Sequence, residues 1–302
     1  MLREVDRLTA EALGHRVGAG AALVEADGLA WLREQPAELF HAVVTDPPYG
    51  LLEYEEAHHD KLRSGKGGVW RQPPALGGSL RSPVPRFTVL TDADRARMGA
   101  FFAEVAEVLL RALVPGGHVF MAANPLLASI PFGALADAGF ERRATIVRLV
   151  QTLRGGDRPK NAHLEFPGVT VMPRSAWEPW GLFRKPFKGT VAQNLRTWGT
   201  GGLRRVSDDE PFRDVIVSAP THKRERTVAA HPSLKPQKLL RELVRASLPL
   251  GEGIVLDPFA GSGSTVAAAA AVGYAAVGVE RDAAYYQLAV DRHEALRDYS
   301  VM

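Results

Sequence analysis

The stretch Gly253-Ile254-Val255-Leu256-Asp257-Pro258-Phe259-Ala260-Gly261-Ser262-Gly263-Ser264-Thr265 decides the fold. Its apolar start predicts a buried strand, its glycines predict a tight loop, and the alanine-rich run after Thr265 predicts a helix. Glycines at such a point let the backbone approach a ligand closely, and the first turn of the helix offers free N–H groups. The stretch therefore predicts a ligand-binding loop between a strand and a helix.

A second apolar strand, residues 275–279, follows that helix and ends at Glu280, seventeen residues after Gly263. A carboxylate in this position can accept hydrogen bonds from ribose hydroxyls. A bare strand–helix turn is the alternative interpretation of the glycines alone. The added carboxylate favours a site for a nucleoside cofactor.

Two residues decide which cofactor the loop suits. A dinucleotide-binding loop carries a third glycine three residues after the second, and Val266 stands there. Asp257 precedes the loop, and its carboxylate would repel a pyrophosphate but attract the ammonium group of a methionine moiety. The loop therefore favours S-adenosylmethionine over NAD.

A second motif, Asp46-Pro47-Pro48-Tyr49, follows an apolar strand at residues 41–45. The two prolines remove two N–H donors, so the nearby carbonyl groups act only as acceptors. Asp46 adds a carboxylate acceptor and Tyr49 adds a ring that can stack. Together these groups suit a planar substrate that carries an NH₂ group, whereas the plainer alternative is a rigid turn with a buried tyrosine.

The order of the predicted elements indicates an α/β fold. Apolar strands alternate with helical periodicity, which predicts a mostly parallel, doubly wound sheet covered by helices on both faces. The predicted strands are residues 21–25, 41–45, 118–123, 145–149, 253–256 and 275–279. Residues 50–90 are rich in Gly, Pro, Arg and Ser and predict a flexible loop.

Positive charge is concentrated in one part of the chain. Residues 141–205 hold thirteen Lys and Arg against four Asp and Glu, while the whole chain has a net charge of only +3. Such a basic segment on an otherwise acidic protein is typical of a polyanion-binding protein, although a solvated arginine-rich face is the alternative. Trp177, Trp180 and Trp198 lie among these charges, where they either contact a ligand or form a core.

The composition excludes several classes of protein. The chain has no cysteine, so a thiolate nucleophile, as in C5-cytosine methylation, and a cysteine-ligated zinc site are both excluded. The sequence has no run of about 18 apolar residues, the length that a membrane span would need. Residues 1–6 also lack the apolar core of a signal peptide. We therefore expect a cytoplasmic, nucleoid-associated protein that requires no metal.

The two motifs, Asp46 to Tyr49 and then Phe259 to Gly263, resemble those of the β-class amino-group DNA methyltransferases. In that family an Asp/Asn/Ser-Pro-Pro-Tyr motif precedes the Phe-x-Gly-x-Gly cofactor loop. The resemblance implies a Rossmann-like S-adenosylmethionine-dependent methyltransferase fold with a circularly permuted motif order and an inserted recognition module. It places the catalytic and cofactor-binding domain at residues 1–150 and 231–302, and a target recognition module at 151–230.

The resemblance also implies individual roles. His231, Ser233 and Lys235 match a His-Pro-Thr-x-Lys-Pro cofactor segment, with Ser in place of the usual Thr, and Asp27 matches an acid near the adenine ring of the cofactor. The predicted catalytic residues are Asp46, Pro47, Pro48 and Tyr49. The predicted cofactor-binding residues are Asp27, His231, Ser233, Lys235, Asp257, Phe259, Gly261, Gly263, Ser264, Thr265 and Glu280. The predicted DNA-binding residues are Arg154, Arg158, Lys160, Arg184, Lys185, Arg204 and Arg205.

The predicted reaction is methylation of an exocyclic amino group on a base flipped out of double-stranded DNA, as in restriction–modification systems. An Asp in the first position of the motif favours N6 of adenine, with N4 of cytosine as the alternative. Two remoter hypotheses are a protein glutamine methyltransferase, whose family usually carries Asn-Pro-Pro-Tyr after the cofactor loop, and a non-catalytic DNA-binding protein. The oligomeric state, including a homodimer, stays open.

Overall fold

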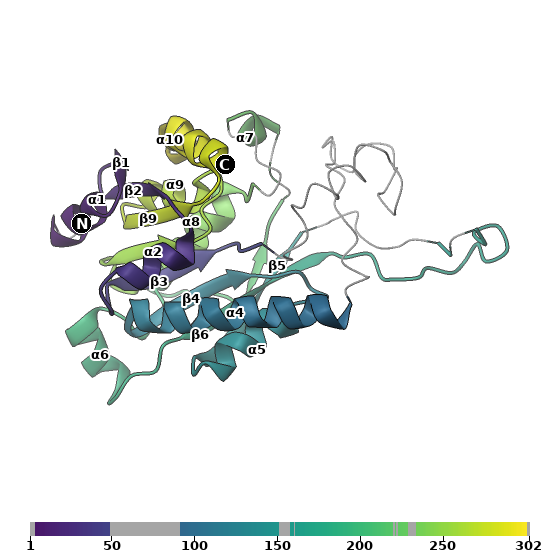
Figure 1. Cartoon of the computed structure of the whole chain (residues 1–302), viewed down its shortest axis with the longest axis horizontal. Coiled ribbons are helices and arrows are strands. Elements are labelled where there is room, and N and C mark those ends of the chain that lie inside the picture. The colour runs from purple at the N-terminus through teal and green to yellow at the C-terminus, as the bar shows by residue number, and fades with distance from the viewer. Residues whose placement is uncertain are drawn as a thin grey trace.

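The computed structural model describes residues 4–48, 91–150, 158–159, 161–219, 221, 223–228 and 234–300. Within these ranges the strands form one sheet in the order β1-β2-β9-β8-β3-β4-β6-β5-β7 (Figure 1). The strands are β1 His15–Gly18, β2 Ala21–Glu25, β3 Phe40–Thr45, β4 Leu113–Ala122, β5 Glu141–Leu149, β6 Trp177–Arg184, β7 Val215–Val217, β8 Ile254–Asp257 and β9 Ala275–Glu280.

The central strands β2, β9, β8, β3 and β4 are all parallel, as predicted. β1 and β6 run antiparallel to their neighbours, and β5 is again parallel to β4 because it is antiparallel to β6. The carboxyl ends of the five central strands therefore meet at one edge of the sheet, which we call the carboxyl edge. We call the side of the sheet where these five strands begin the opposite edge.

Helices cover both faces of the sheet, which confirms the doubly wound fold. The described helices are α1 Glu4–Ala12, α2 Gly28–Glu34, α4 Asp92–Ala112, α5 Ser129–Asp137, α6 Val191–Trp198, α7 Lys223–Val228, α8 Gln237–Ser247, α9 Ser264–Ala271 and α10 Ala283–Arg297. α1, α2, α4 and α5 pack on one face, and α8, α9 and α10 pack on the other. In β3 and β4, successive side chains alternate between the two cores: Val43 and Met121 face the first, Val44 and Phe120 the second.

Polar side chains fix where the helices begin. Thr91 and Asp94 form a reciprocal capping box at the start of α4, in which Thr91 Oγ1 accepts from the Asp94 backbone N–H at 3.1 Å. Asp282 caps α10 in a related way, by accepting from the backbone N–H groups of Ala284 and Tyr285. These caps set the ends of the loops at the carboxyl edge.

β6 and β7 lie within residues 151–230, the range predicted to form a separate module. β6 is nevertheless inserted between β4 and β5, and both Trp180 and Phe183 of β6 are fully buried in the cores. These aromatic residues are therefore core residues. The sheet therefore extends beyond the predicted boundary near residue 150. β6 provides the hydrogen-bonding partner that β4 would otherwise lack on that side.

Candidate active site

A buried hydrogen bond joins the two predicted motifs at the carboxyl edge. Thr45 Oγ1, at the end of β3, donates to Asp257 Oδ1, at the end of β8, over 2.7 Å. β3 and β8 are neighbours in the sheet, so residues 212 apart in the chain meet here. Asp46, the next residue after Thr45, therefore lies beside the start of the glycine loop.

Asp257 is a buried carboxylate in an acceptor role. It accepts from Thr45 and from the Phe259 backbone N–H at 3.1 Å, and its side chain also bonds Thr265. Burial raises the pKa of Asp257 to about 6, although these hydrogen bonds lower it, and the nearby Asp46 charge raises it further. A cation bound next to Asp257 would relieve this cost, so the site favours a positively charged ligand group.

The glycine loop takes a backbone conformation that favours glycine. Gly261 and Gly263 have φ angles of 52° and 75°, in the left-handed region. The Gly261 N–H donates to Glu280 Oε2 at 2.7 Å, and the Asp282 N–H donates to Glu280 Oε1 at 2.8 Å. Glu280 thus orders the loop, and each of its oxygens keeps a lone pair for a further donor such as a hydroxyl.

Asp27 lies in the adjacent loop, after β2. Its Oδ1 accepts from the N–H groups of Leu29 and Ala30, so it caps α2. A Cβ on Gly28 would stand 2.2 Å from the Pro258 carbonyl oxygen, which shows how closely this loop packs on the glycine loop. The structure therefore brings Asp27 beside the predicted cofactor loop and also gives it a structural role.

Lys235, predicted to contact cofactor, lies against the catalytic motif. Its Nζ donates to Asp46 Oδ2 and stands 3.6 Å from Glu178 Oε1. Glu178 belongs to β6 and in turn pairs with Arg148 of β5 at 3.1 Å. Sequence reasoning missed Glu178 and Arg148, because neither belongs to a motif and only the strand pairing places them opposite each other.

The other predicted residues of the loop are also located. Ser264 and Thr265 are buried in the first turn of α9, and the Phe259 ring is 6.0 Å from the Phe101 ring. Pro47 is buried and Pro48 is partly exposed after Asp46. Some predictions lie outside the described residues: Tyr49, His231, Ser233, Arg154, Lys160 and the whole of the loop 50–90.

The predicted DNA-binding residues do not lie together. Arg184 is buried at the opposite edge, where it pairs with Glu141 and donates to the Gly201 carbonyl at 2.9 Å. Lys185 is next to it and donates to the Leu113 carbonyl at 2.8 Å. These two cations are used within the protein at the edge remote from Asp46, because β6 is antiparallel to β4.

Arg204 and Arg205 also lie near the opposite edge, by the end of α8. The Arg204 backbone N–H donates to the Ala246 carbonyl, and its side chain donates to the Tyr274 hydroxyl. Arg158, in contrast, is exposed, and Arg148 of the same basic stretch lies near the end of β5, at the carboxyl edge. Figure 1 shows residues 161–176, before β6, as an extended segment on the side of the sheet away from α6. The basic stretch of the sequence therefore divides between two edges.

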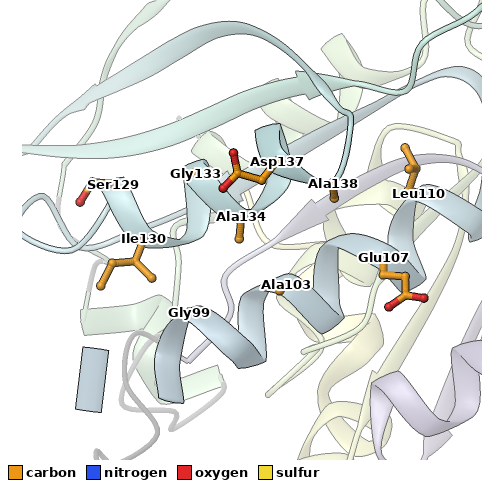
Figure 2. A pocket seen from close by; sticks show the side chains of 10 residues that line it. All are labelled: Gly99, Ala103, Glu107, Leu110, Ser129, Ile130, Gly133, Ala134, Asp137 and Ala138. Carbon is orange, nitrogen blue, oxygen red and sulfur yellow. The ribbon is translucent and has the colours of Figure 1, made fainter. Parts of the chain in front are cut away.

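A shallow groove of about 570 Å³ lies elsewhere, between α4 and α5 (Figure 2). Small residues such as Gly99, Ala103 and Gly133 line it, with the carboxylates of Glu107 and Asp137 at its rim. No predicted site residue lines this groove, so it is distinct from the candidate active site.

The described part of the chain offers neither a metal cluster nor a membrane span. In those ranges, no three His, Asp or Glu side chains are grouped so that they could hold a metal ion. Likewise, no described helix has the length and apolar character that crossing a membrane requires.

The strand order and the loops at the carboxyl edge define a doubly wound α/β protein with a ligand site at that edge. The family model described as DNA methylase, N6_N4_Mtase, matches residues 170–291, which include β6, Lys235, the glycine loop and Glu280. Over these residues, which are less than half of the chain, the sequence is similar to that family.

The type II methyltransferase M.HindIII of Haemophilus influenzae is 25% identical over 298 residues, which cover 89% of this chain and 94% of that protein. The type II methyltransferase M2.DpnII of Streptococcus pneumoniae is 33% identical over 93 residues. That match spans 31% of this chain and only 34% of M2.DpnII.

Among solved structures, the M1.HpyAVI–SAM complex is similar, with a TM-score of 0.53 and 18% identity. The similarity covers 89% of this chain and 98% of that chain, and it supports the fold.

Proposed function

We propose that this protein transfers a methyl group from S-adenosylmethionine to an exocyclic amino group in double-stranded DNA, with N6 of adenine as the target. The Thr45–Asp257 hydrogen bond carries the proposal, because Asp46, the acceptor that we propose for the amino group, follows Thr45 and so lies beside the predicted cofactor loop. The match of residues 170–291 to the DNA methylase family model and the SAM-bound structure of the similar protein M1.HpyAVI support the same donor and substrate.

The residues at the carboxyl edge fit this donor. Gly261 and Gly263 allow the backbone to approach a ligand, Glu280 retains acceptor capacity for ribose hydroxyls, and Asp257 favours a nearby cation. When bound, S-adenosylmethionine supplies an electrophilic methyl group on a positively charged sulfur. Asp257 would attract the methionine ammonium group, and Asp27, whose loop packs on the glycine loop, would contact the adenine end.

Asp46 and the Pro47 carbonyl then act on the target base. An exocyclic amino nitrogen is a weak nucleophile because its lone pair is conjugated with the ring. Hydrogen bonds from its two N–H groups to Asp46 and to the Pro47 carbonyl favour a pyramidal nitrogen with a free lone pair. With the donor bound, Asp46 and the Pro47 carbonyl would hold the nitrogen in line with the methyl group; the sulfur would leave with the electron pair of the broken bond and the amino proton would pass by way of Asp46 to water. Catalysis would therefore rest on positioning and electrostatics.

The target base is inferred from the first residue of the motif. Asp46 favours adenine, since N4-cytosine members of the family often carry Ser at that position. The hydrogen-bond argument applies equally to N4 of cytosine, which is therefore the second candidate.

Nucleoside mass spectrometry of unmethylated plasmid DNA treated with the protein and S-adenosylmethionine tests the proposal. We expect N6-methyladenine in the digest and none with a cofactor-free control. N4-methylcytosine would move the assignment to the second candidate. Cofactor binding by calorimetry with no methylated nucleoside, on DNA of varied sequence, would contradict the proposed reaction.

A further inference from the structure

A line of four charged side chains leads from the catalytic motif into the sheet. Asp46 contacts Lys235, Lys235 approaches Glu178 at 3.6 Å, and Glu178 pairs with Arg148 at 3.1 Å. All four side chains are largely buried, with exposed fractions of 17%, 10%, 18% and 6% along this order. Charges removed from water in this way are costly unless each has partners, so their geometry is closely constrained.

Glu178 is the most firmly held member of this line. Its Oε1 accepts from the Trp180 indole Nε1–H at 2.9 Å, and its Oε2 accepts from Arg148. Arg148 donates in addition to the Ala219 carbonyl at 3.2 Å, and Trp180 is completely buried. The carboxylate therefore has a fixed position on β6, from which it attracts the Lys235 ammonium that also contacts Asp46.

This geometry matters for the two oxygens of Asp46. Lys235 contacts Oδ2, and a target amino group needs the same carboxylate held in a fixed orientation to accept its hydrogen bond. A lysine side chain has four rotatable bonds, so without a second anchor its ammonium can move across both oxygens. Glu178 supplies that anchor.

We propose that Glu178, held by Arg148 and Trp180, is a positioning residue that fixes the Lys235 ammonium on Asp46 and so orients the Asp46 carboxylate for the target amino group. The proposal rests on the proposed methyl transfer, since it concerns the same site. It predicts that Glu178 affects the rate of transfer rather than the binding of cofactor or DNA.

The same pair of strands offers a matched control. Glu141 of β5 and Arg184 of β6 also form a cross-strand ion pair, with Arg184 Nε at 2.9 Å from Glu141 Oε2, but at the opposite edge. This second pair contacts neither Asp46 nor Lys235 among the interactions of the described residues. A purely structural role of Glu178 would give both pairs the same effect.

The test compares Glu178→Gln with Glu141→Gln in the full chain. Single-turnover transfer of tritium from labelled S-adenosylmethionine to DNA gives the rate, calorimetry gives the cofactor affinity, and thermal unfolding gives Tm. We expect Glu178→Gln to slow transfer by about 10- to 100-fold with little change in cofactor or DNA affinity, since small misplacements at a reacting centre have effects of this size. Glu141→Gln should transfer at close to the wild-type rate even if its Tm falls.

A wild-type rate for Glu178→Gln, or an equal loss in both variants, would overturn the proposal. If Glu178→Gln does not yield folded protein, Glu178→Asp replaces it, because Asp keeps the charge but withdraws it by one methylene; the same order of rates is expected. Failure of the wild-type protein to transfer methyl groups would contradict the proposed function itself, so the two failures are distinguishable.

Discussion

The two edges of the sheet use charged residues differently. At the carboxyl edge, the ion pair between Arg148 and Glu178 continues through Lys235 to the catalytic motif. At the opposite edge, the ion pair between Arg184 and Glu141 ends on a backbone carbonyl and on the Phe187 ring. The same two strands thus carry one pair connected to the site and one that only joins parts of the fold. Both pairs consist of an Arg and a Glu, so it is their position along the strands, and not their residue types, that decides which pair contacts the candidate site.

The largest expected effect on cofactor binding concerns Gly261, in the loop before α9, and Gly273 just after α9 serves as its control. Gly261→Val should lower the affinity for S-adenosylmethionine by at least about 100-fold, because the branched side chain fills the space of a closely approaching ligand and strains a backbone with φ of 52°. Gly273, after α9, has a similar φ of 80° and open space around it. Gly273→Val should therefore show comparable backbone strain with near-normal affinity in calorimetry. Equal affinities for the two variants would remove the loop from the cofactor site.

The second prediction concerns the cost of the buried Asp257 carboxylate to the stability of the cofactor-free protein. Its pKa is raised from 3.8 to about 6, so the folded protein binds the proton more tightly than the unfolded chain, and the free energy of unfolding falls as pH rises through this range. At pH 7 the buried charge costs on the order of 3 kcal/mol. Asp257→Asn should therefore raise the Tm of the cofactor-free protein at pH 7 and lose this advantage near pH 4.

The same variant should bind S-adenosylmethionine more weakly, since the attraction for the ammonium group is removed. Thermal unfolding with and without cofactor, at both pH values, measures the two effects together. A variant less stable than wild type at pH 7 but with unchanged cofactor affinity would refute the role of Asp257.

The smallest expected effect concerns DNA and compares two groups of three basic residues. Replacing Arg154, Arg158 and Lys160 together by Gln should reduce the slope of log affinity against log salt concentration by about 0.9 for each DNA phosphate that the protein no longer neutralises. The control replaces the exposed Lys188, Arg196 and Arg205, which lie with α6 and the end of α8, and removes the same charge. Fluorescence anisotropy at several salt concentrations should show a smaller change in the control. Equal changes of this slope in the two triple variants would indicate that both groups of basic residues contact DNA.

The central strands could be predicted from the sequence because they are continuous apolar runs bounded by turns. β2 and β9 lie within one residue of the predicted ranges. β6 could not be predicted in this way, since Pro179 and Gly181 interrupt its pattern. Gly181 is needed there because a Cβ would stand 2.6 Å from the Phe132 ring. A close approach between distant segments is not visible in a local sequence pattern.

The residues of the candidate site also fall into two groups, those that the sequence could predict and those that it could not. Asp46, Asp257 and Glu280 could be predicted, because each directly follows or ends a recognisable strand and parallel strands end at one edge. Glu178 and Arg148 could not, because their pairing depends on the register of β5 and β6 across a segment of about thirty residues. Lys235 was predicted as a cofactor contact, and the structure places it on Asp46.

The most direct measurement of the central claim is the single-turnover rate of methyl transfer by Asp46→Ala and Asp46→Asn. Loss of one preorganised acceptor at a reacting centre typically costs on the order of 10² to 10³ in rate. We predict at least this loss for Asp46→Ala, a smaller loss for Asp46→Asn, which keeps a carbonyl acceptor, and nearly unchanged binding of S-adenosylmethionine and DNA in both. Methyl transfer by Asp46→Ala at the wild-type rate would contradict the account.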